Sequence, residues 1–182
     1  MAETSGKKKL QQILGDLNSA DEKKIAKALK SLETHGDSSA IKPLAKMLLS
    51  DVSDKNRSSI IELFSSLKDS STAVEIMDII GDESYLEIRP LMLTTVWNTK
   101  VDFSDYIDEF VEIAVKGTFM ETLDCLTIVE NMEGPFMEEN ILECQLHLKD
   151  YLEDTAPKEA QKAQLLSELA ILIKDINEKL MD

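Results

Sequence analysis

Three segments of this chain carry the same pattern of apolar residues at a spacing of 33 residues. Within each segment the apolar residues recur at intervals of three, which places them on one side of a helix. The segments are Ile41, Leu44 and Met47, then Val74, Met77 and Ile80, then Ile107, Phe110 and Ile113. A repeat of about 20 to 50 residues indicates stacked helical units, each of which buries its apolar side against its neighbours.

A second set of apolar residues precedes this pattern and repeats at a spacing of 35 residues. Ile25, Ala28, Leu29 and Leu32 are matched by Ile60, Leu63, Phe64 and Leu67. Each unit is therefore predicted to be a pair of helices, with a shorter loop inside the second unit. Capping-box pairs mark the expected helix starts. These pairs are Ser19 with Glu22, Thr72 with Glu75, Ser84 with Glu87, and Thr118 with Glu121.

The patterns predict an all-α fold. We expect a short helix at 7–14, pairs at 20–34 with 39–50, 55–68 with 72–81, 84–97 with 104–116 and 118–132 with 136–152, and a last helix at 157–180. The last helix has a single long apolar stripe and is predicted to cap the stack. We expect one compact domain, with a basic arm and short helix at 1–18, helical repeats at 19–152 and the capping helix at 153–182.

Composition agrees with a helical protein that folds in water. Hydrophobic residues make up 43% of the 182 residues and charged residues 30%, which leaves enough apolar side chains for a core. There is no apolar run long enough to span a membrane and no apolar signal-peptide segment at the start, so we expect a cytoplasmic protein. Cys125 and Cys144 are predicted to be buried thiols rather than a disulfide. His35 and His147 have no zinc-site spacing, and we expect neither a metal nor a cofactor.

The segment Gly36-Asp37-Ser38-Ser39-Ala40-Ile41-Lys42-Pro43-Leu44 resembles the loop and second helix of short bacterial HEAT-type repeats. Residues 69–74 keep part of this motif without the proline, the third unit has a longer loop at 98–103, and the fourth aligns only through Ile141, Leu142 and Leu148. The resemblance implies an α-solenoid of about four antiparallel helix pairs, a HEAT or armadillo-like superhelix, whose second helices line the concave side. It also implies protein binding, with enzymes and nucleic-acid binders as a minority. An irregular helical bundle is the alternative fold.

Charge is distributed unevenly along the chain. Residues 1–70 hold 12 Lys and Arg against 10 Asp and Glu, whereas residues 71–182 hold 8 against 25. In a stack of repeats, position in the sequence becomes distance along the stack, so the later repeats are predicted to be strongly acidic. An acidic surface of this kind is either a solvated surface that favours solubility or a docking surface for a basic partner.

The candidate docking surface consists of acidic residues on the predicted second helices. These residues are Glu75, Asp78, Asp108, Glu109 and Glu112, followed by Glu139 and Glu143. Trp97 is included because it precedes the longest internal loop, and tryptophan is enriched at interface hot spots. The alternative for Trp97 and the nearby Phe103 is that they fill the space that this loop opens.

These observations favour a non-catalytic protein-binding scaffold or adaptor that docks a basic protein. The acidic charge disfavours nucleic acid, whose phosphates it would repel, and the lysines lack the neighbouring aromatic residues of a membrane anchor. No phosphate loop or nucleophile motif indicates catalysis. Two alternatives stay open: an enzyme or enzyme subunit of the HEAT-repeat lyase type, and a salt-dependent self-assembling protein that joins its basic first repeats to the acidic end of another copy.

Overall fold

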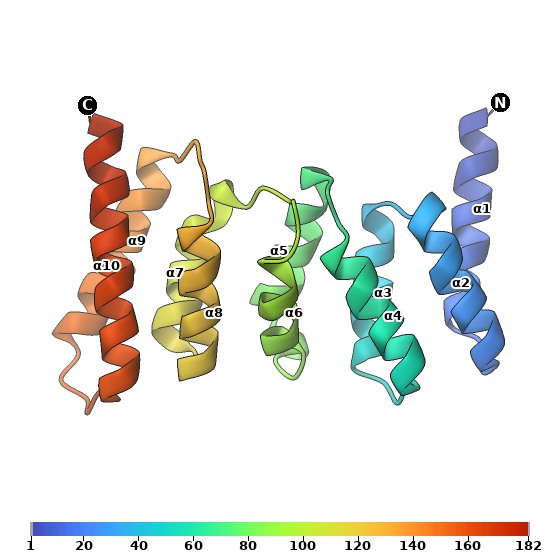
Figure 1. The fold of residues 1–182 in the computed structure, drawn as a ribbon, viewed down its shortest axis with the longest axis horizontal. Helices are drawn as coiled ribbons and strands as arrows, with labels where there is room; N and C mark the ends of the chain where they lie inside the picture. Colours follow the sequence, from blue (N-terminus) through green and yellow to red (C-terminus); the bar gives the residue numbers. More distant parts are fainter. Residues whose placement is uncertain (1, 182) are drawn as a thin grey trace. The chain divides into compact units, whose positions relative to one another are not determined.

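The computed structural model describes residues 2–181, with side chains from residue 6 onward, and it is all-α (Figure 1). Ten α-helices and four short 3₁₀ helices are present, and no strand occurs among residues 2–181. The prediction of an all-α fold is therefore confirmed. Met1, the first residue of the predicted basic arm, lies outside the described residues.

The chain forms two compact units, which we call unit 1 (residues 1–101) and unit 2 (residues 102–182). Unit 1 contains α1 to α6, and unit 2 contains α7 to α10. The predicted parts at 1–18, 19–152 and 153–182 are a different division of the chain, and they stay a prediction.

The six helices of unit 1 pack in an alternating order. They are α1 (Ala2–Leu17), α2 (Glu22–His35), α3 (Ile41–Leu48), α4 (Asp54–Ser65), α5 (Ala73–Gly81) and α6 (Arg89–Val96). Helix α2 packs on α4 and α4 packs on α6, whereas α3 packs on α5. The first helices of successive pairs therefore contact one another, and so do the second helices. The predicted helix pairs of this part of the chain match these elements.

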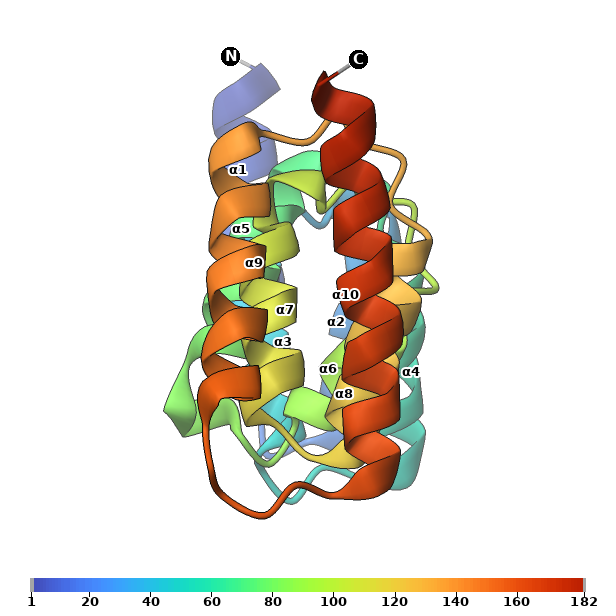
Figure 2. The same ribbon diagram turned by 90° about the vertical axis from the view of Figure 1, so that its left-hand side faces the viewer.

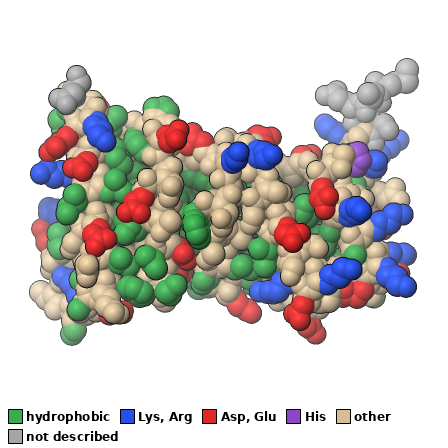
Figure 3. Space-filling view, in the orientation of Figure 1, with side chains coloured by type: hydrophobic (Ala, Val, Ile, Leu, Met, Phe, Trp, Pro, Cys, Tyr) green, Lys and Arg blue, Asp and Glu red, His purple; other side chains and the backbone are tan. Residues whose placement is uncertain are grey.

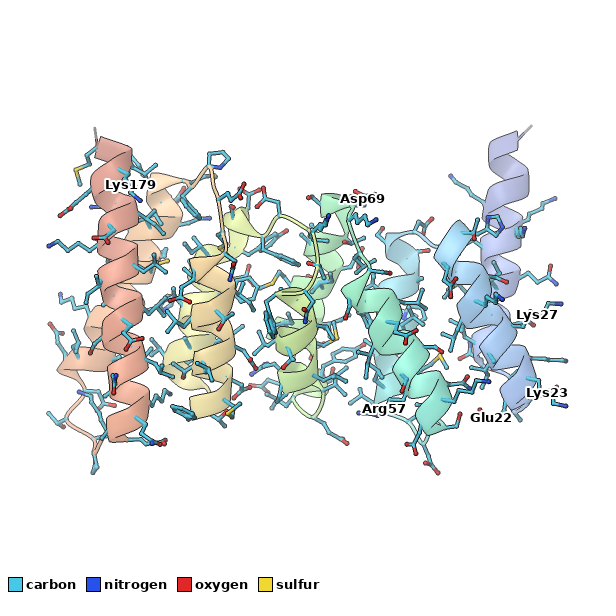
Figure 4. All side chains as sticks on the ribbon, viewed as in Figure 1. Glu22, Lys23, Lys27, Arg57, Asp69 and Lys179 are labelled. Atoms are coloured by element: carbon cyan, nitrogen blue, oxygen red, sulfur yellow. The ribbon has the colours of Figure 1, made fainter. Side chains whose placement is uncertain are left out.

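A polar contact joins the starts of the first helices in unit 1. Glu22, labelled at the start of α2 in Figure 4, accepts hydrogen bonds of 2.6 Å from Nδ2 of Asn56 and from Oγ of Ser53. Asn56 is a buried polar residue of α4, and this bond satisfies its side-chain amide, which would be costly to bury without a partner. The contact therefore fixes α4 against the first turn of α2.

Unit 2 consists of four helices that pack on one another. They are α7 (Ile107–Lys116), α8 (Phe119–Glu130), α9 (Glu138–Glu153) and α10 (Ala160–Met181). Helix α7 packs on α8 and α9, and α10 packs on the same two helices; α9 and α10 lie toward the viewer in Figure 2. The last helix begins at Ala160, three residues after the predicted start at Pro157. Its predicted stripe is buried, including Leu169 and Ile173.

The second helices share a buried pattern whose spacing is 32, 34 and 34 residues instead of a constant 33. Three positions are buried in all four helices: Ile41, Ala73, Ile107 and Ile141; Leu44, Ile76, Phe110 and Cys144; and Leu48, Ile80, Ala114 and Leu148. The predicted register is wrong in α5, where Val74 is 53% exposed and Ile76 is buried. The reason is a shorter connection: the 3₁₀ turn before α3 begins at Ser38 and the turn before α5 begins at Ser70.

Aspartates accept the first backbone hydrogen bond at several helix starts. The side chains of Asp21, Asp37, Asp69 and Asp82 each accept a bond from the backbone N–H two residues later. These bonds satisfy N–H groups that a helix start leaves without a partner inside the helix. The bond from the N–H of Ser71 lowers the pKa of Asp69, and the bond from Ser84 does the same for Asp82.

Of the four predicted capping boxes, the structure contains the one formed by Thr118 and Glu121. The backbone N–H of Glu121 donates to Oγ1 of Thr118, and the backbone N–H of Thr118 donates to Oε2 of Glu121. The boxes predicted at Ser19, Thr72 and Ser84 are wrong. In each case an aspartate two or three residues away caps the start, because an ionised carboxylate is a stronger acceptor than a hydroxyl.

Basic side chains satisfy the carbonyl groups at the ends of three second helices. Nη1 of Arg57, labelled in Figure 4, donates to the carbonyl of Leu48 over 3.0 Å, and Nε of Arg89 donates to the carbonyl of Ile80 over 2.6 Å. In unit 2, Nζ of Lys162 on α10 donates to the carbonyls just before and after the end of α7, over 2.7 and 2.6 Å. A cation is favourable there because a helix end has free carbonyls and a partial negative charge.

Candidate protein-binding surface

Two of the predicted docking residues, Glu75 and Asp78, lie on α5 in unit 1 and bind Lys42 of α3. Nζ of Lys42 donates a hydrogen bond of 2.7 Å to Oδ2 of Asp78 and lies 3.4 Å from Oε2 of Glu75. These bonds, the one to Asp78 first, raise the pKa of Lys42. The lysine is therefore charged at neutral pH and offsets part of the negative charge at this place.

Three further predicted residues, Asp108, Glu109 and Glu112, follow one another on α7 in unit 2 and are partly buried. Asp108 and Glu112 are four residues apart and so lie on the same side of the helix. Lys116 forms an ion pair with Glu112, and the hydrogen bond between them lowers the pKa of Glu112. Helix α7 therefore presents two carboxylates in a row, with one lysine at its end.

Helix α9 packs on α7 and adds the last two predicted carboxylates, Glu139 and Glu143, both of which are exposed. The start of α9 is held against the start of α7, because Nδ2 of Asn140 donates a hydrogen bond of 2.7 Å to the carbonyl of Asp105. This contact places Glu139 beside the acidic first turns of α7.

Carboxylates from α7 and α9 come together near the buried Cys144. Burial raises the pKa of the Cys144 thiol to about 12, and the nearby charges of Asp108 and Glu143 contribute to the rise. One turn further along, the charge of His147 on α9 contributes to lowering the pKa of Glu112 on α7. We call the carboxylates that this pairing gathers the acidic strip: Asp105, Asp108 and Glu112 from α7 and the turn before it, and Glu139 and Glu143 from α9.

The acidic strip lies in the unit that carries almost all of the net charge. Residues 102–182 hold 6 Lys and 20 Asp and Glu, a net charge of −14, whereas residues 1–101 hold 14 Lys and Arg and 15 Asp and Glu, a net charge of −1. On the side of unit 1 that Figure 3 shows, basic side chains gather over α1 and α2. The field of unit 2 therefore favours cations at its surface.

The last predicted residue, Trp97, ends α6 in unit 1 and is 46% exposed. Phe103 is buried in unit 2, where its ring meets the ring of Phe110 edge to face with centroids 5.9 Å apart. The space-filling interpretation therefore applies to Phe103. A binding role for Trp97 stays a prediction, as do the binding roles of the seven carboxylates.

Helix α9 also exposes two leucines that the sequence analysis did not select as binding residues. Leu142 is 55% exposed and Leu146 is 42% exposed, while Ile141, Cys144 and Leu148 of the same helix are buried. Leu142 was aligned with the buried repeat positions, and the structure places Ile141 there instead. The spacing of four between Leu142 and Leu146, outside the buried stripe, is the signal that identifies them. We call this pair the leucine ridge.

Unit 1 contains two hollows, and neither lies at the predicted docking carboxylates of unit 2. The first has a volume of about 620 Å³ and lies beside the start of α2, with Lys42 and Lys46 in its wall. The second has a volume of about 480 Å³ and is lined by residues that include Leu44 and Phe64. Because Lys42 is bound to Asp78 and keeps its proton, it is a poor candidate for a general base.

Two kinds of site were also sought across the chain. Among residues 6–181, no three His, Cys, Asp or Glu side chains form a group that could hold a metal ion. No helix within residues 2–181 has both the length and the apolar composition required to cross a membrane.

Comparison of the chain with protein-family models, with curated proteins and with solved structures finds no match. The functional proposal is therefore built on the packing, charge and exposure of the residues described above.

Proposed function

We propose that this protein is a non-catalytic protein-binding scaffold that docks a basic protein on the acidic strip of unit 2. The observation that carries the proposal is the gathering of carboxylates from α7 and α9 around Cys144, in a unit with 20 acidic residues and 6 lysines. Complementary charges at an interface speed association and orient the partner, and they act over a Debye length of about 8 Å at physiological salt. A partner with a basic patch is the matching surface.

We propose in addition that the chain is a small α-solenoid of the HEAT type with α10 as its cap. Three observations support this fold: the shared buried positions of α3, α5, α7 and α9, the alternating helix contacts of unit 1, and the single buried stripe of α10. A solenoid presents its second helices as one extended surface, which suits the docking of a protein. A cytoplasmic location belongs to the same proposal and fits the two buried cysteine thiols.

The docking proposal is tested by capturing partners from a lysate of the native host at low and at high salt. The test variant carries Asp108→Lys, Glu109→Lys and Glu112→Lys on α7. The matched control carries Glu168→Lys, Asp175→Lys and Glu178→Lys, which make the same change in charge at exposed positions of α10. We expect wild type and control to retain one basic protein at low salt, and the α7 variant to lose it.

Two outcomes would reject the docking proposal. In the first, the α7 variant is folded, as shown by an unchanged circular dichroism spectrum, and captures the same proteins as wild type. In the second, both triple variants lose the partner equally, which would assign the capture to net charge alone rather than to the acidic strip.

Self-assembly is a second candidate function, because unit 1 gathers lysines while unit 2 is strongly acidic. Helix α2 holds four of these lysines, Lys23, Lys24, Lys27 and Lys30. Sedimentation of the purified protein decides this point. A mass that rises with concentration at low salt and falls at high salt would support assembly, whereas a monomer under both conditions would exclude it.

A further inference from the structure

The leucine ridge stands on the side of α9 directly opposite the core of unit 2. At 3.6 residues per turn, Leu142 and Leu146 share one line along the helix, and the buried residues Ile141, Cys144 and Leu148 lie on the other side. The two leucines are one turn apart, about 6 Å along the helix axis. An exposed apolar row on a helix whose own apolar side is already covered is a feature of binding surfaces.

Carboxylates border the leucine ridge on the side that approaches α7. Moving around α9 from the ridge, helical geometry places Glu139 and Glu143 first and then Asn140 and His147. Asn140 bonds to the carbonyl of Asp105, and Glu143 acts on the same thiol as Asp108, so this side of α9 leads directly to α7. The ridge and the acidic strip therefore form one continuous surface with an apolar edge and an acidic edge.

The opposite border of the ridge is less acidic. Lys149 lies on that side and pairs with Glu153 over 3.8 Å, and Gln145 beside it is neutral. The surface is therefore asymmetric across the ridge. A partner that matches it needs apolar residues along one line and positive charge along one neighbouring line.

We propose that α9 docks an amphipathic helix of the partner, with apolar residues on the leucine ridge and Lys or Arg over the acidic strip. This inference rests on the proposed docking function and names the chemistry of the partner segment. Helices are recognised through anchors spaced by three, four and seven residues, which match the one-turn separation of Leu142 and Leu146. The charge of the strip selects a basic flank.

Charge also argues against two other occupants of the ridge. A second copy of this chain in a two-fold contact would bring the acidic strips of both copies close together, which is unfavourable because the same patch faces itself. The cytoplasmic side of a membrane is negatively charged, and Glu139 and Glu143 would be repelled by it. Both occupants are outcomes that the experiment below detects.

The test measures binding of a labelled synthetic peptide to the full-length protein by fluorescence anisotropy. The peptide is a helix former with leucines on one line and lysines on the neighbouring line. We expect Leu142→Gln with Leu146→Gln to weaken binding about tenfold, because the apolar anchors supply most of the affinity. We expect Glu139→Gln with Glu143→Gln to weaken binding at low salt and to reduce the dependence on salt.

Matched variants and peptides separate this site from general attraction. Met120→Gln and Ile171→Gln alter exposed apolar residues of α8 and α10, and Glu130→Gln with Glu133→Gln removes two exposed carboxylates near the end of α8. All of these should bind the peptide as wild type does. A peptide with serine in place of leucine, and one with glutamate in place of lysine, should each bind at least about tenfold more weakly.

Three results would overturn the inference. The first is tight binding of the peptide by the folded leucine variant. The second is an equal loss in the control variants. The third is a wild-type dimer, or binding of wild type to vesicles with a fifth of anionic lipid, that the leucine variant abolishes. If the α7 variant loses the captured basic protein and the leucine variant keeps it, the docking function stands and the helix inference fails.

Discussion

Arg89 donates a hydrogen bond of 2.6 Å from its Nε to the backbone carbonyl of Ile80, nine residues earlier in the chain. Arg57 makes the equivalent bond to Leu48, also nine residues earlier. These are the two arginines of the sequence, and Leu48 and Ile80 occupy the same position of the repeat. Each arginine therefore ties the start of a first helix to the end of the second helix before it, which fixes the connection between successive pairs.

Removing either arginine is expected to destabilise the protein. Arg57→Ala or Arg89→Ala leaves a partly buried carbonyl without its charged donor and should lower the free energy of unfolding by about 1.5 to 3 kcal/mol. Urea unfolding followed by circular dichroism measures this difference. The exposed Lys55→Ala on α4 is the control and should change stability by less than about 0.5 kcal/mol. Equal effects of Arg57→Ala and Lys55→Ala would show that the bond contributes nothing.

The register of α5 makes opposite predictions for two neighbouring apolar residues. Ile76 is buried and Val74 is exposed, so Ile76→Ala should cost about 2 to 5 kcal/mol of stability, whereas Val74→Ala should cost less than about 0.5 kcal/mol. Thermal or urea unfolding of the two variants decides between the observed register and a constant period of 33. A larger loss for Val74→Ala would restore the constant period.

The capping box at the start of α8 is expected to contribute measurably to stability. Thr118→Ala removes the hydroxyl that accepts the backbone N–H of Glu121 and should cost about 1 kcal/mol. Thr118→Ser keeps a hydroxyl at the same place and should retain most of the stability. Similar unfolding midpoints for the alanine and serine variants would argue against the box.

The aspartates at the helix starts predict a dependence of stability on acid pH. Backbone N–H bonds, from Ser71 and Ser84 respectively, lower the pKa values of Asp69 and Asp82 below the usual 3.8. Because the folded pKa lies below the unfolded one, each carboxylate contributes stability above pH 3.8, and that contribution is lost as the pH falls through the folded pKa.

A double variant measures this contribution. The loss of stability caused by Asp69→Asn with Asp82→Asn should be present near pH 6 and should shrink toward zero below the folded pKa values. Urea midpoints of wild type and variant across this range give the comparison, and carbon-13 titration of the two carboxyl groups gives the pKa values directly. A titration of both groups at 3.8 in the folded protein would contradict the bonds.

Apolar periodicity was sufficient to predict the fold class and the order of the helices, because most helices bury one stripe. The register of α5 could not be predicted in the same way. From Ala73 to Ile80 this helix is apolar at nearly every position, so Val74 and Ile76 are equally suitable for a buried stripe. The choice is made by a turn that is one residue shorter, and such a difference has no signature in the apolar pattern.

The candidate surface was predictable in its charge but not in its contacts. The acidic residues of α7 and α9 were identified from the sequence, since their excess over lysine is a property of composition. The bond from Lys42 to Asp78 joins residues 36 positions apart, and only the packing of α3 on α5 brings them together. Leu142 and Leu146 were missed because exposed leucines and core leucines look alike until the register of α9 is known.

The central claim is that the acidic strip of unit 2 is the docking surface, and hydrogen exchange on the complex tests it most directly. Backbone amide exchange of the protein alone and of the protein bound to its captured partner would be compared by mass spectrometry. We predict slower exchange in residues 107–116 and 138–153 on binding, and loss of this protection at high salt. Protection confined to unit 1, or protection of α7 and α9 that does not change with salt, would contradict the account.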